Sequence, residues 1–297
     1  MPAYKLGLYE KAMPGNLSLV EKLTAVPEGG YDFLELSIDE TDEKLARLDW
    51  TDAEIHQARR SIEHTGTPIT SICLSAHRRF PLGDPDKVVR DQSIAIMEKA
   101  ILLAARLGVR IIQIAGYDVY YKPSTDATCA FFAENLARSA EAAACLGIML
   151  AFETMETPFI NTVEKAIRWV NKINSPFLAV YPDLGNITCA AAGDSNRVQA
   201  DLESGRGHIA ALHLKETKPG IFREVLYGTG HVNFSEGVKT AWNLGVRSFT
   251  AEFWWTAGAS AEWKVILQRN NQFLRKFFEN RKAMQTETEQ KRSEILR

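Results

Sequence analysis

The chain has 297 residues, of which 45% are hydrophobic and 24% charged, so it can bury a large core and has the length of one barrel or two smaller domains. Its 35 basic and 37 acidic residues give a formal net charge of -2, which argues against nucleic acid or an anionic membrane as the main partner. No stretch approaches the roughly 20 apolar residues of a membrane-spanning helix, and no basic and apolar secretory signal begins the chain. We therefore expect a cytoplasmic protein.

Eight short segments rich in β-branched and aromatic residues recur along the chain, with amphipathic stretches between them. This alternation predicts parallel strands joined by crossover helices. In chain order the expected strands are KLGLYE near residue 4, YDFLELS near 31, ITSICLS near 69, RIIQIAG near 110, IMLAFE near 148, FLAVYPD near 177, HIAALHL near 208 and RSFTAEF near 247.

The expected helices have clear ends. The segment DKVVRDQSIAIMEKAILLAARLG carries apolar residues at helical spacing, and Gly108 is placed to end it; two later helices are expected to end at Gly147 and Gly245. No Pro- or Gly-rich linker separates the eight units, so the pattern predicts one α/β domain, a single (β/α)8 TIM barrel over residues 1–280. An open doubly wound sheet is the alternative. Residues 281–297 are polar and are expected to extend the last helix or fray.

Four potential metal ligands lie at or next to the ends of four successive predicted segments: Glu153, Asp183, His213 and Glu252. They are 30, 30 and 39 residues apart, the length of one strand, one helix and two loops. All strands of such a barrel point their C-terminal ends at the same rim, so these side chains are expected to converge. Three carboxylates and one imidazole suit Mn²⁺, Mg²⁺, Co²⁺ or Zn²⁺. Any one of them alone is more often a capped or solvated loop residue than a functional one.

Several longer strings carry a specific resemblance: LGLYEKA (6–12), LSAHRRFPLG (74–83), AGYDVYY (115–121), YPDLGN (181–186) and HLKETKPG (213–220). Together they resemble the L-xylulose 5-phosphate and L-ribulose 5-phosphate 3-epimerases, which are xylose-isomerase-like barrels. The resemblance runs from about residue 4 to residue 256. It implies a (β/α)8 barrel and a divalent metal held by the same four residues. It also implies epimerisation of L-xylulose 5-phosphate to L-ribulose 5-phosphate, in the breakdown of L-ascorbate or related pentose precursors.

The chemistry of such a reaction explains two glutamates in the ligand set. Epimerising a ketose at C3 removes the proton beside the C2 carbonyl, forms an enediolate and returns a proton to the other face. A divalent cation stabilises the developing negative charge. Two faces require two proton-transferring groups, and we expect Glu153 and Glu252 to act as base and acid.

Two further residues near these ligands are expected to contact the substrate. Glu156 lies three residues after Glu153, where it can orient that ligand or bind a hydroxyl, although a solvated loop glutamate is the alternative. Related ketose 3-epimerases carry an Asp-x-x-His motif whose His contacts the substrate, and this chain has Asn186 at that position. This difference fits the epimerases of phosphorylated ketopentoses better than those of free sugars.

Basic residues after the third and seventh expected strands are candidates for the phosphate. His77, Arg78 and Arg79 follow the third strand, and guanidinium groups match phosphate oxygens well. Lys215 and Lys218 follow the seventh strand, close to the region where many such barrels bind phosphate. We expect His77 and Lys218 to contact the sugar or its phosphate. Salt bridges within the loop are the alternative for the two arginines.

The expected partners are a small sugar phosphate and a second copy of the chain in a homodimer, with no nucleic acid and no membrane. Three other readings stay open. One is a different isomerase or a dehydratase of the same barrel family, related to hydroxypyruvate isomerase or inosose dehydratase. Another is an endonuclease-IV-like DNA-repair nuclease, which needs more histidine ligands than a slightly acidic chain with six histidines readily supplies. The third is a non-catalytic sugar-binding protein, against which the paired glutamates argue.

Overall fold

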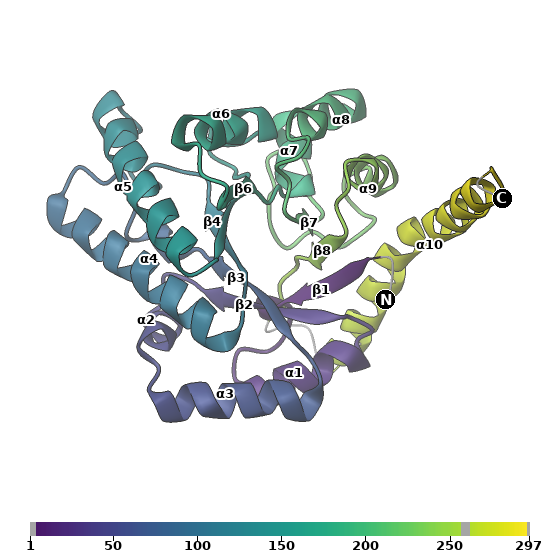
Figure 1. Cartoon of the computed structure of the whole chain (residues 1–297), viewed down its shortest axis with the longest axis horizontal. Coiled ribbons are helices and arrows are strands. Elements are labelled where there is room, and N and C mark those ends of the chain that lie inside the picture. The colour runs from purple at the N-terminus through teal and green to yellow at the C-terminus, as the bar shows by residue number, and fades with distance from the viewer. Residues whose placement is uncertain (1–3, 257–261, 296–297) are drawn as a thin grey trace.

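The computed structural model describes residues 4–256 and 262–295, with parallel strands at the centre and helices around them (Figure 1). The strands are β1 (Lys5–Tyr9), β2 (Phe33–Ile38), β3 (Ile69–Leu74), β4 (Ile111–Ala115), β5 (Met149–Glu153), β6 (Leu178–Val180), β7 (Leu212–Leu214) and β8 (Ser248–Ala251). Seven of them lie inside their predicted segments, and β2 extends one residue beyond YDFLELS, to Ile38, so the predicted strands are confirmed.

The sheet has the order β6-β5-β4-β3-β2-β1-β8-β7, so β6 and β7 stand at its two ends. These ends meet through two isolated parallel bridges, Val180 with Ile209 and Asp183 with His213. The second bridge includes a hydrogen bond of 2.9 Å from the His213 amide to the Pro182 carbonyl. The sheet is therefore curled toward closure as predicted, and the seam carries two of the four predicted metal ligands.

Helices surround the strands and connect them in sequence (Figure 1). They are α1 (Leu19–Glu28), α2 (Asp42–Leu45), α3 (Asp52–Thr65), α4 (Lys87–Leu107), α5 (Asp126–Cys145), α6 (Val163–Ile173), α7 (Leu184–Ala190), α8 (Ser195–Ser204), α9 (Phe234–Asn243) and α10 (Trp263–Ile295), with 3-10 helices η1 (Glu10–Ala12), η2 (Ala46–Asp49) and η3 (Ala76–Arg78). Gly108 ends α4 at a φ of 76°, in the left-handed region that glycine adopts without strain. Gly147 and Gly245 follow α5 and α9, again with positive φ.

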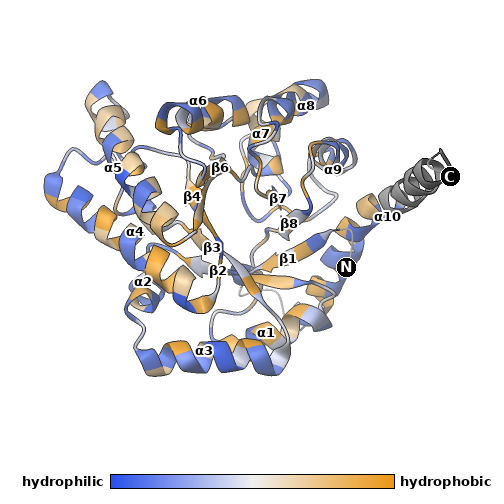
Figure 2. Ribbon diagram, in the orientation of Figure 1, coloured by the Kyte–Doolittle hydropathy of each residue, from blue (hydrophilic) through white to orange (hydrophobic). Residues whose placement is uncertain are grey.

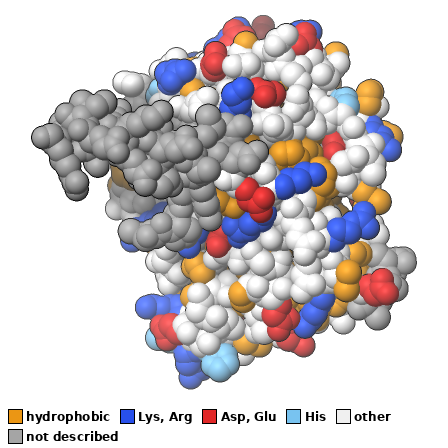
Figure 3. Space-filling view, turned by 90° about the vertical axis from the view of Figure 1, so that its right-hand side faces the viewer, with side chains coloured by type: hydrophobic (Ala, Val, Ile, Leu, Met, Phe, Trp, Pro, Cys, Tyr) orange, Lys and Arg blue, Asp and Glu red, His pale blue; other side chains and the backbone are white. Residues whose placement is uncertain are grey.

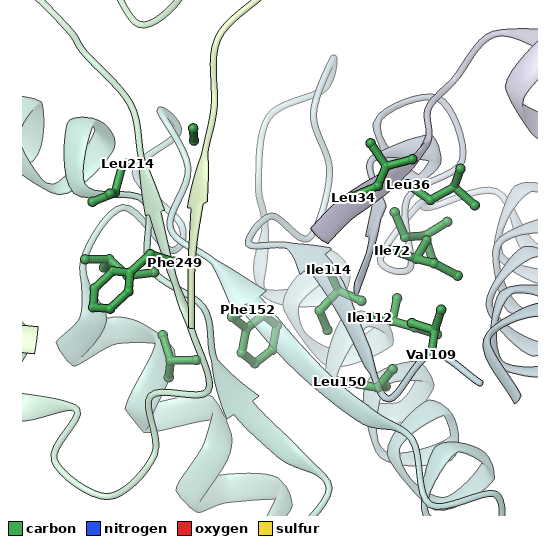
Figure 4. Packing of buried hydrophobic residues seen from close by; sticks show 14 of the residues in the cluster. Leu34, Leu36, Ile72, Val109, Ile112, Ile114, Leu150, Phe152, Leu214 and Phe249 are labelled. Atoms are coloured by element: carbon green, nitrogen blue, oxygen red, sulfur yellow. The ribbon is translucent and has the colours of Figure 1, made fainter. Parts of the chain in front are cut away.

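The core consists of strand side chains packed against the inner faces of the helices. Figure 2 shows hydrophobic residues concentrated on the strands and on the helix faces turned toward them. Leu36, Ile72, Ile112 and Leu150, from β2, β3, β4 and β5, are all fully buried in one cluster (Figure 4). Truncating one such leucine or isoleucine to alanine typically costs about 2–5 kcal/mol. This core fixes the strand ends from which the site is built.

The first turn after β1 is anchored by a buried carboxylate. Glu10 in η1 is 1% exposed and accepts hydrogen bonds from Lys22 (2.7 Å), Lys44 (3.2 Å) and Arg47 (2.6 Å). Burial raises the pKa of Glu10, but the three cations outweigh it and hold that pKa well below its usual range. The cluster ties η1 to α1, α2 and η2 on one side of the rim.

The last helix, α10, packs against the residues that precede β1 and β2. Asn271 of α10 donates to the Gly30 carbonyl (2.9 Å), Arg275 pairs with Asp32 (3.0 Å), and the ring of Phe278 stacks on Tyr4 at 4.2 Å. The helix continues past Phe278 to Ile295. The predicted division of the chain at residue 280 stays a prediction.

The outer surface is mixed in charge. Figure 3 shows acidic and basic side chains interspersed over the face beside α10, as the near-neutral composition leads one to expect. Among the described residues, no helix is both long enough and apolar enough to cross a membrane.

Candidate metal centre and substrate cavity

The structure brings the four predicted ligands together. Glu153 is the last residue of β5, Asp183 caps the N-terminus of α7, His213 lies in β7, and Glu252 directly follows β8. One ligand atom from each lies within 4.8 Å of the others, and all four residues are buried. A backbone hydrogen bond between neighbouring strands helps to hold this arrangement: the Glu252 amide donates to the Leu214 carbonyl at 3.0 Å.

The cluster has the chemistry of a site for a divalent cation. Oδ2 of Asp183 is buried without a hydrogen-bond partner, while its Oδ1 accepts from the Asn186 amide at 2.6 Å. An unpaired buried carboxylate oxygen is costly, and a cation would satisfy it. Three carboxylates and one imidazole suit Mn²⁺, Mg²⁺, Co²⁺ or Zn²⁺. The residues present therefore fit a divalent metal.

A fourth carboxylate, that of Glu35, orients the imidazole from the side away from the cluster. Nε2 of His213 donates to Oε1 of Glu35 at 2.6 Å, and Glu35 also accepts from the Ser71 hydroxyl at 2.6 Å. The ring of Tyr181 packs edge-on against the imidazole at 4.9 Å. Because Nε2 is bonded to Glu35, Nδ1 is the nitrogen that faces the cluster, 2.8 Å from Oε2 of Glu252.

The two glutamates of the cluster differ in proton affinity. Burial, with the charge of Glu252 nearby, raises the pKa of Glu153 to about 8. Burial acts in the same direction on Glu252, but Lys215 and His213 outweigh it and hold the pKa of Glu252 well below its usual range. In the metal-free site, one carboxyl therefore favours its protonated form and the other its ionised form.

Protons occupy the cluster in the absence of a cation. Burial raises the pKa of Asp183 to about 7. Burial lowers the pKa of His213, but the carboxylates of Glu35 and Glu252 outweigh this and raise it well above its usual value. A cation bound to Nδ1 would replace that proton, so metal binding releases protons from the site.

A cavity of about 500 Å³ opens over the cluster. It is lined by both glutamates of the cluster, by four cationic side chains and by several aromatic or apolar side chains. Its lining residues are Tyr9, Lys11, Cys73, Ser75, Arg78, Glu153, Met155, Glu156, Lys215, Phe222, Arg223, Glu252 and Trp254.

Of the four predicted substrate contacts, Glu156 is the one that lines this cavity. Its carboxylate accepts from the Tyr120 hydroxyl at 2.7 Å and from Arg223 at 3.1 Å. Asn186 is buried beside the cluster, where its side-chain amide donates to the Thr154 carbonyl at 2.7 Å. It supports the Asp183 loop and does not line the cavity.

His77 and Lys218 also lie away from the cavity. The turn of η3 directs the His77 ring toward α4, where Nε2 lies 3.2 Å from the Ser93 carbonyl. Burial lowers the pKa of His77 to about 4, so it carries no charge for a phosphate at neutral pH. Lys218 is exposed, and its backbone pairs with Ile221 in a tight turn. The structure does not bring either side chain to the predicted position.

Two arginines, Arg78 and Arg223, line the cavity, whereas His77 and Lys218 do not. The guanidinium of Arg78 lies over the Tyr120 ring at 4.7 Å, and its buried Nε has no hydrogen-bond partner. Arg79 turns outward and pairs with Asp42 at 2.7 Å. Arg223 reaches the cavity from the long loop after β7, and no sequence pattern marked it.

Comparisons with known proteins agree with this geometry. A family model described as "Xylose isomerase-like TIM barrel" matches residues 23–277. The chain is 45% identical over 235 residues to L-ribulose-5-phosphate 3-epimerase UlaE of Salmonella heidelberg (strain SL476), covering 79% of this chain and 81% of the relative. It is 46% identical over 261 residues to the putative L-ribulose-5-phosphate 3-epimerase SgbU of Escherichia coli (strain K12), covering 86% and 90%.

Solved structures support the fold. D-psicose 3-epimerase with D-tagatose from Clostridium cellulolyticum H10 matches with a TM-score of 0.77 at 17% identity, covering 93% of this chain and 99% of that one. A structure of L-ribulose 3-epimerase matches with a TM-score of 0.73 at 16% identity, covering 99% and 98%. At these identities the likeness concerns the fold alone. Taken with the family match and the closer relatives, it follows that the chain belongs to the xylose isomerase-like TIM barrel family and, within it, to the L-ribulose-5-phosphate 3-epimerases.

Proposed function

We propose that the chain is an isomerase that epimerises L-ribulose 5-phosphate at C3, interconverting it with L-xylulose 5-phosphate. The relatives that are about 45% identical bear the name of this activity. One structural observation carries the proposal: Glu153 and Glu252 belong to the same buried ligand cluster and line the same cavity.

The cation site in this proposal consists of Glu153, Asp183, His213 and Glu252. A bound dication would supply positive charge against the negative charge that develops on the sugar oxygens. The two glutamates move the proton. One carboxylate takes the proton from C3, the electron pair of the C3–H bond forms the C2–C3 double bond, and the C2 oxygen becomes negative. The other glutamate returns a proton to C3 from the opposite face, and the roles exchange in the reverse direction.

Arg78 and Arg223 are the residues that we assign to the substrate phosphate. Both line the cavity that holds the glutamates. Arg78 has an unsatisfied buried Nε, and its nearest carboxylate, Glu40, lies 3.8 Å away. Arg223 exchanges its bond to Glu156 for the phosphate oxygens in this assignment. Guanidinium groups match phosphate geometry with paired hydrogen bonds, which favours these two side chains over the exposed Lys218.

The remaining features stay predictions: Mn²⁺, Mg²⁺, Co²⁺ or Zn²⁺ as the native cation, a homodimer as the working unit, and a cytoplasmic location. Metal analysis of the purified protein and light scattering test the first two.

Product analysis tests the proposed function. The protein, loaded in turn with each of the four cations, is incubated with L-ribulose 5-phosphate and the products are identified by NMR. We expect L-xylulose 5-phosphate to appear until equilibrium, and no product with metal-loaded Glu153→Gln. A pentose 5-phosphate with an aldehyde, or a C4 epimer, would assign the barrel to a different reaction.

A further inference from the structure

A buried lysine stands between the metal centre and the cavity. Lys215 directly follows β7, two residues after His213, and its side chain is 5% exposed. Its Nζ lies 3.3 Å from Oδ1 of Asp183 and 3.6 Å from Oε2 of Glu252. The ring of Trp254 covers the ammonium group at 5.9 Å. Both Lys215 and Trp254 line the cavity.

The donors of Lys215 are not used up by these contacts. An ammonium group has three N–H donors and no acceptor. The two carboxylate oxygens account for two donors at most, which leaves at least one for a ligand in the cavity. A buried cation beside an aromatic face is shielded from water, so its hydrogen bonds and its charge act more strongly there than at the surface.

Lys215 also lies among the negative charges of the centre. Asp183, Glu153 and Glu252, when ionised, bring three negative charges, of which a dication would balance two. Lys215 adds a positive charge directly beside Asp183 and Glu252. When a glutamate takes the C3 proton, the total charge is unchanged, but one negative charge moves from a carboxylate to a sugar oxygen. A fixed cation that lies beside Glu252 and faces the cavity can stabilise both distributions.

We propose that Lys215 is a further catalytic residue, whose ammonium group donates a hydrogen bond to the substrate oxygen that becomes negative as the C3 proton leaves. This inference rests on the proposed 3-epimerase function. Lys215 transfers no proton in this step: the C3 proton goes to a glutamate, the C–H electron pair forms the C2–C3 double bond, and the C2 carbonyl pair moves onto the oxygen. Lys215 thereby complements the bound dication from the side of Asp183 and Glu252.

The test separates this role from a purely structural one. Lys215→Met keeps the length of the side chain and removes its charge. Because the dication is no longer repelled by a neighbouring cation, we expect Mn²⁺, measured by titration calorimetry, to bind at least about tenfold more tightly. At saturating Mn²⁺, kcat for L-ribulose 5-phosphate is expected to fall about a hundredfold to a thousandfold, the typical effect of losing one donor to a developing oxyanion. If Lys215 only shaped the site, its replacement would lower the Mn²⁺ affinity and kcat together.

Controls make each outcome decisive. Lys239→Met removes an exposed lysine of α9 that pairs with Glu236, and both quantities should stay within about twofold of the parent. Lys215→Arg keeps the charge and should recover part of kcat. A kcat of Lys215→Met within fivefold of the parent, or weaker Mn²⁺ binding, overturns the inference. A parent protein without epimerase activity would instead reject the proposed function, while the Mn²⁺ titrations still report on the charge of Lys215.

Discussion

Substitution of Glu35 gives the most specific test of the metal centre, because Glu35 contacts the cation site only through His213. Its carboxylate is fully buried and accepts from Nε2 of His213 and from the Ser71 hydroxyl, both at 2.6 Å. Replacing such a partner of a metal-binding histidine typically weakens metal affinity about 10- to 100-fold. We expect Glu35→Gln, which keeps one acceptor oxygen and loses the charge, to lie near tenfold, and Glu35→Leu near a hundredfold.

Stability gives an independent measure of the same contacts. Glu35→Leu leaves the Nε2–H of His213 and the hydroxyl of Ser71 without an acceptor, and each unsatisfied buried donor costs about 1–3 kcal/mol. The metal-free Glu35→Leu protein should therefore lose about 2–6 kcal/mol in its free energy of unfolding, and Glu35→Gln clearly less.

Titration calorimetry with Mn²⁺ measures the affinity, and urea unfolding of the metal-free proteins measures the stability. Glu98→Gln is the matched control, since Glu98 is an exposed carboxylate of α4 that pairs with Arg138. It should change neither quantity appreciably. An Mn²⁺ affinity of Glu35→Gln within twofold of the parent would refute the view that Glu35 orients and polarises the metal-binding imidazole.

Three further predictions follow from the geometry. Asp183→Asn and His213→Ala should each lose most of the bound cation by elemental analysis, and an unchanged stoichiometry in both would contradict the ligand assignment. Arg78→Ala should lower kcat/KM for L-ribulose 5-phosphate about 10- to 100-fold and change free L-ribulose turnover little, with Arg79→Ala as the control; an equal loss on both substrates would make Arg78 structural. Glu10→Gln should cost about 3–5 kcal/mol of unfolding free energy at pH 7. Because the folded pKa of Glu10 lies below its ordinary 4.5, this difference is present above pH 4.5 and shrinks as the pH falls toward the folded pKa; a difference independent of pH would contradict it.

The strands could be predicted because their apolar runs are bounded by glycines and polar turns. The way in which β6 and β7 meet could not be predicted, because these strands form regular ladders over three residues each and are joined only by isolated bridges. The predicted segments FLAVYPD and HIAALHL are longer than that. How much of each segment pairs depends on the tilt of strands around the barrel, which is a property of the whole sheet.

The four metal ligands could also be predicted, since each follows an apolar run at a strand end. Glu35 was missed although it carried a signal: it is a charged residue inside the fully buried strand FLELSI. His77, Arg78 and Arg79 could not be told apart, because in a 3-10 turn successive side chains point about 120° apart, and only the structure shows which one faces the cavity. Arg223 depends on the path of a long loop, which no periodicity reveals.

Solvent exchange at C3 tests the central claim most directly. L-ribulose 5-phosphate is incubated with the metal-loaded protein in D2O, and the position of deuterium in the recovered sugar phosphates is read by NMR and mass spectrometry. The proposed chemistry predicts one deuterium at C3 in the L-xylulose 5-phosphate formed, and none at C1 or C4. Deuterium at C1, or turnover with no deuterium at C3, would contradict proton transfer at C3 by Glu153 and Glu252.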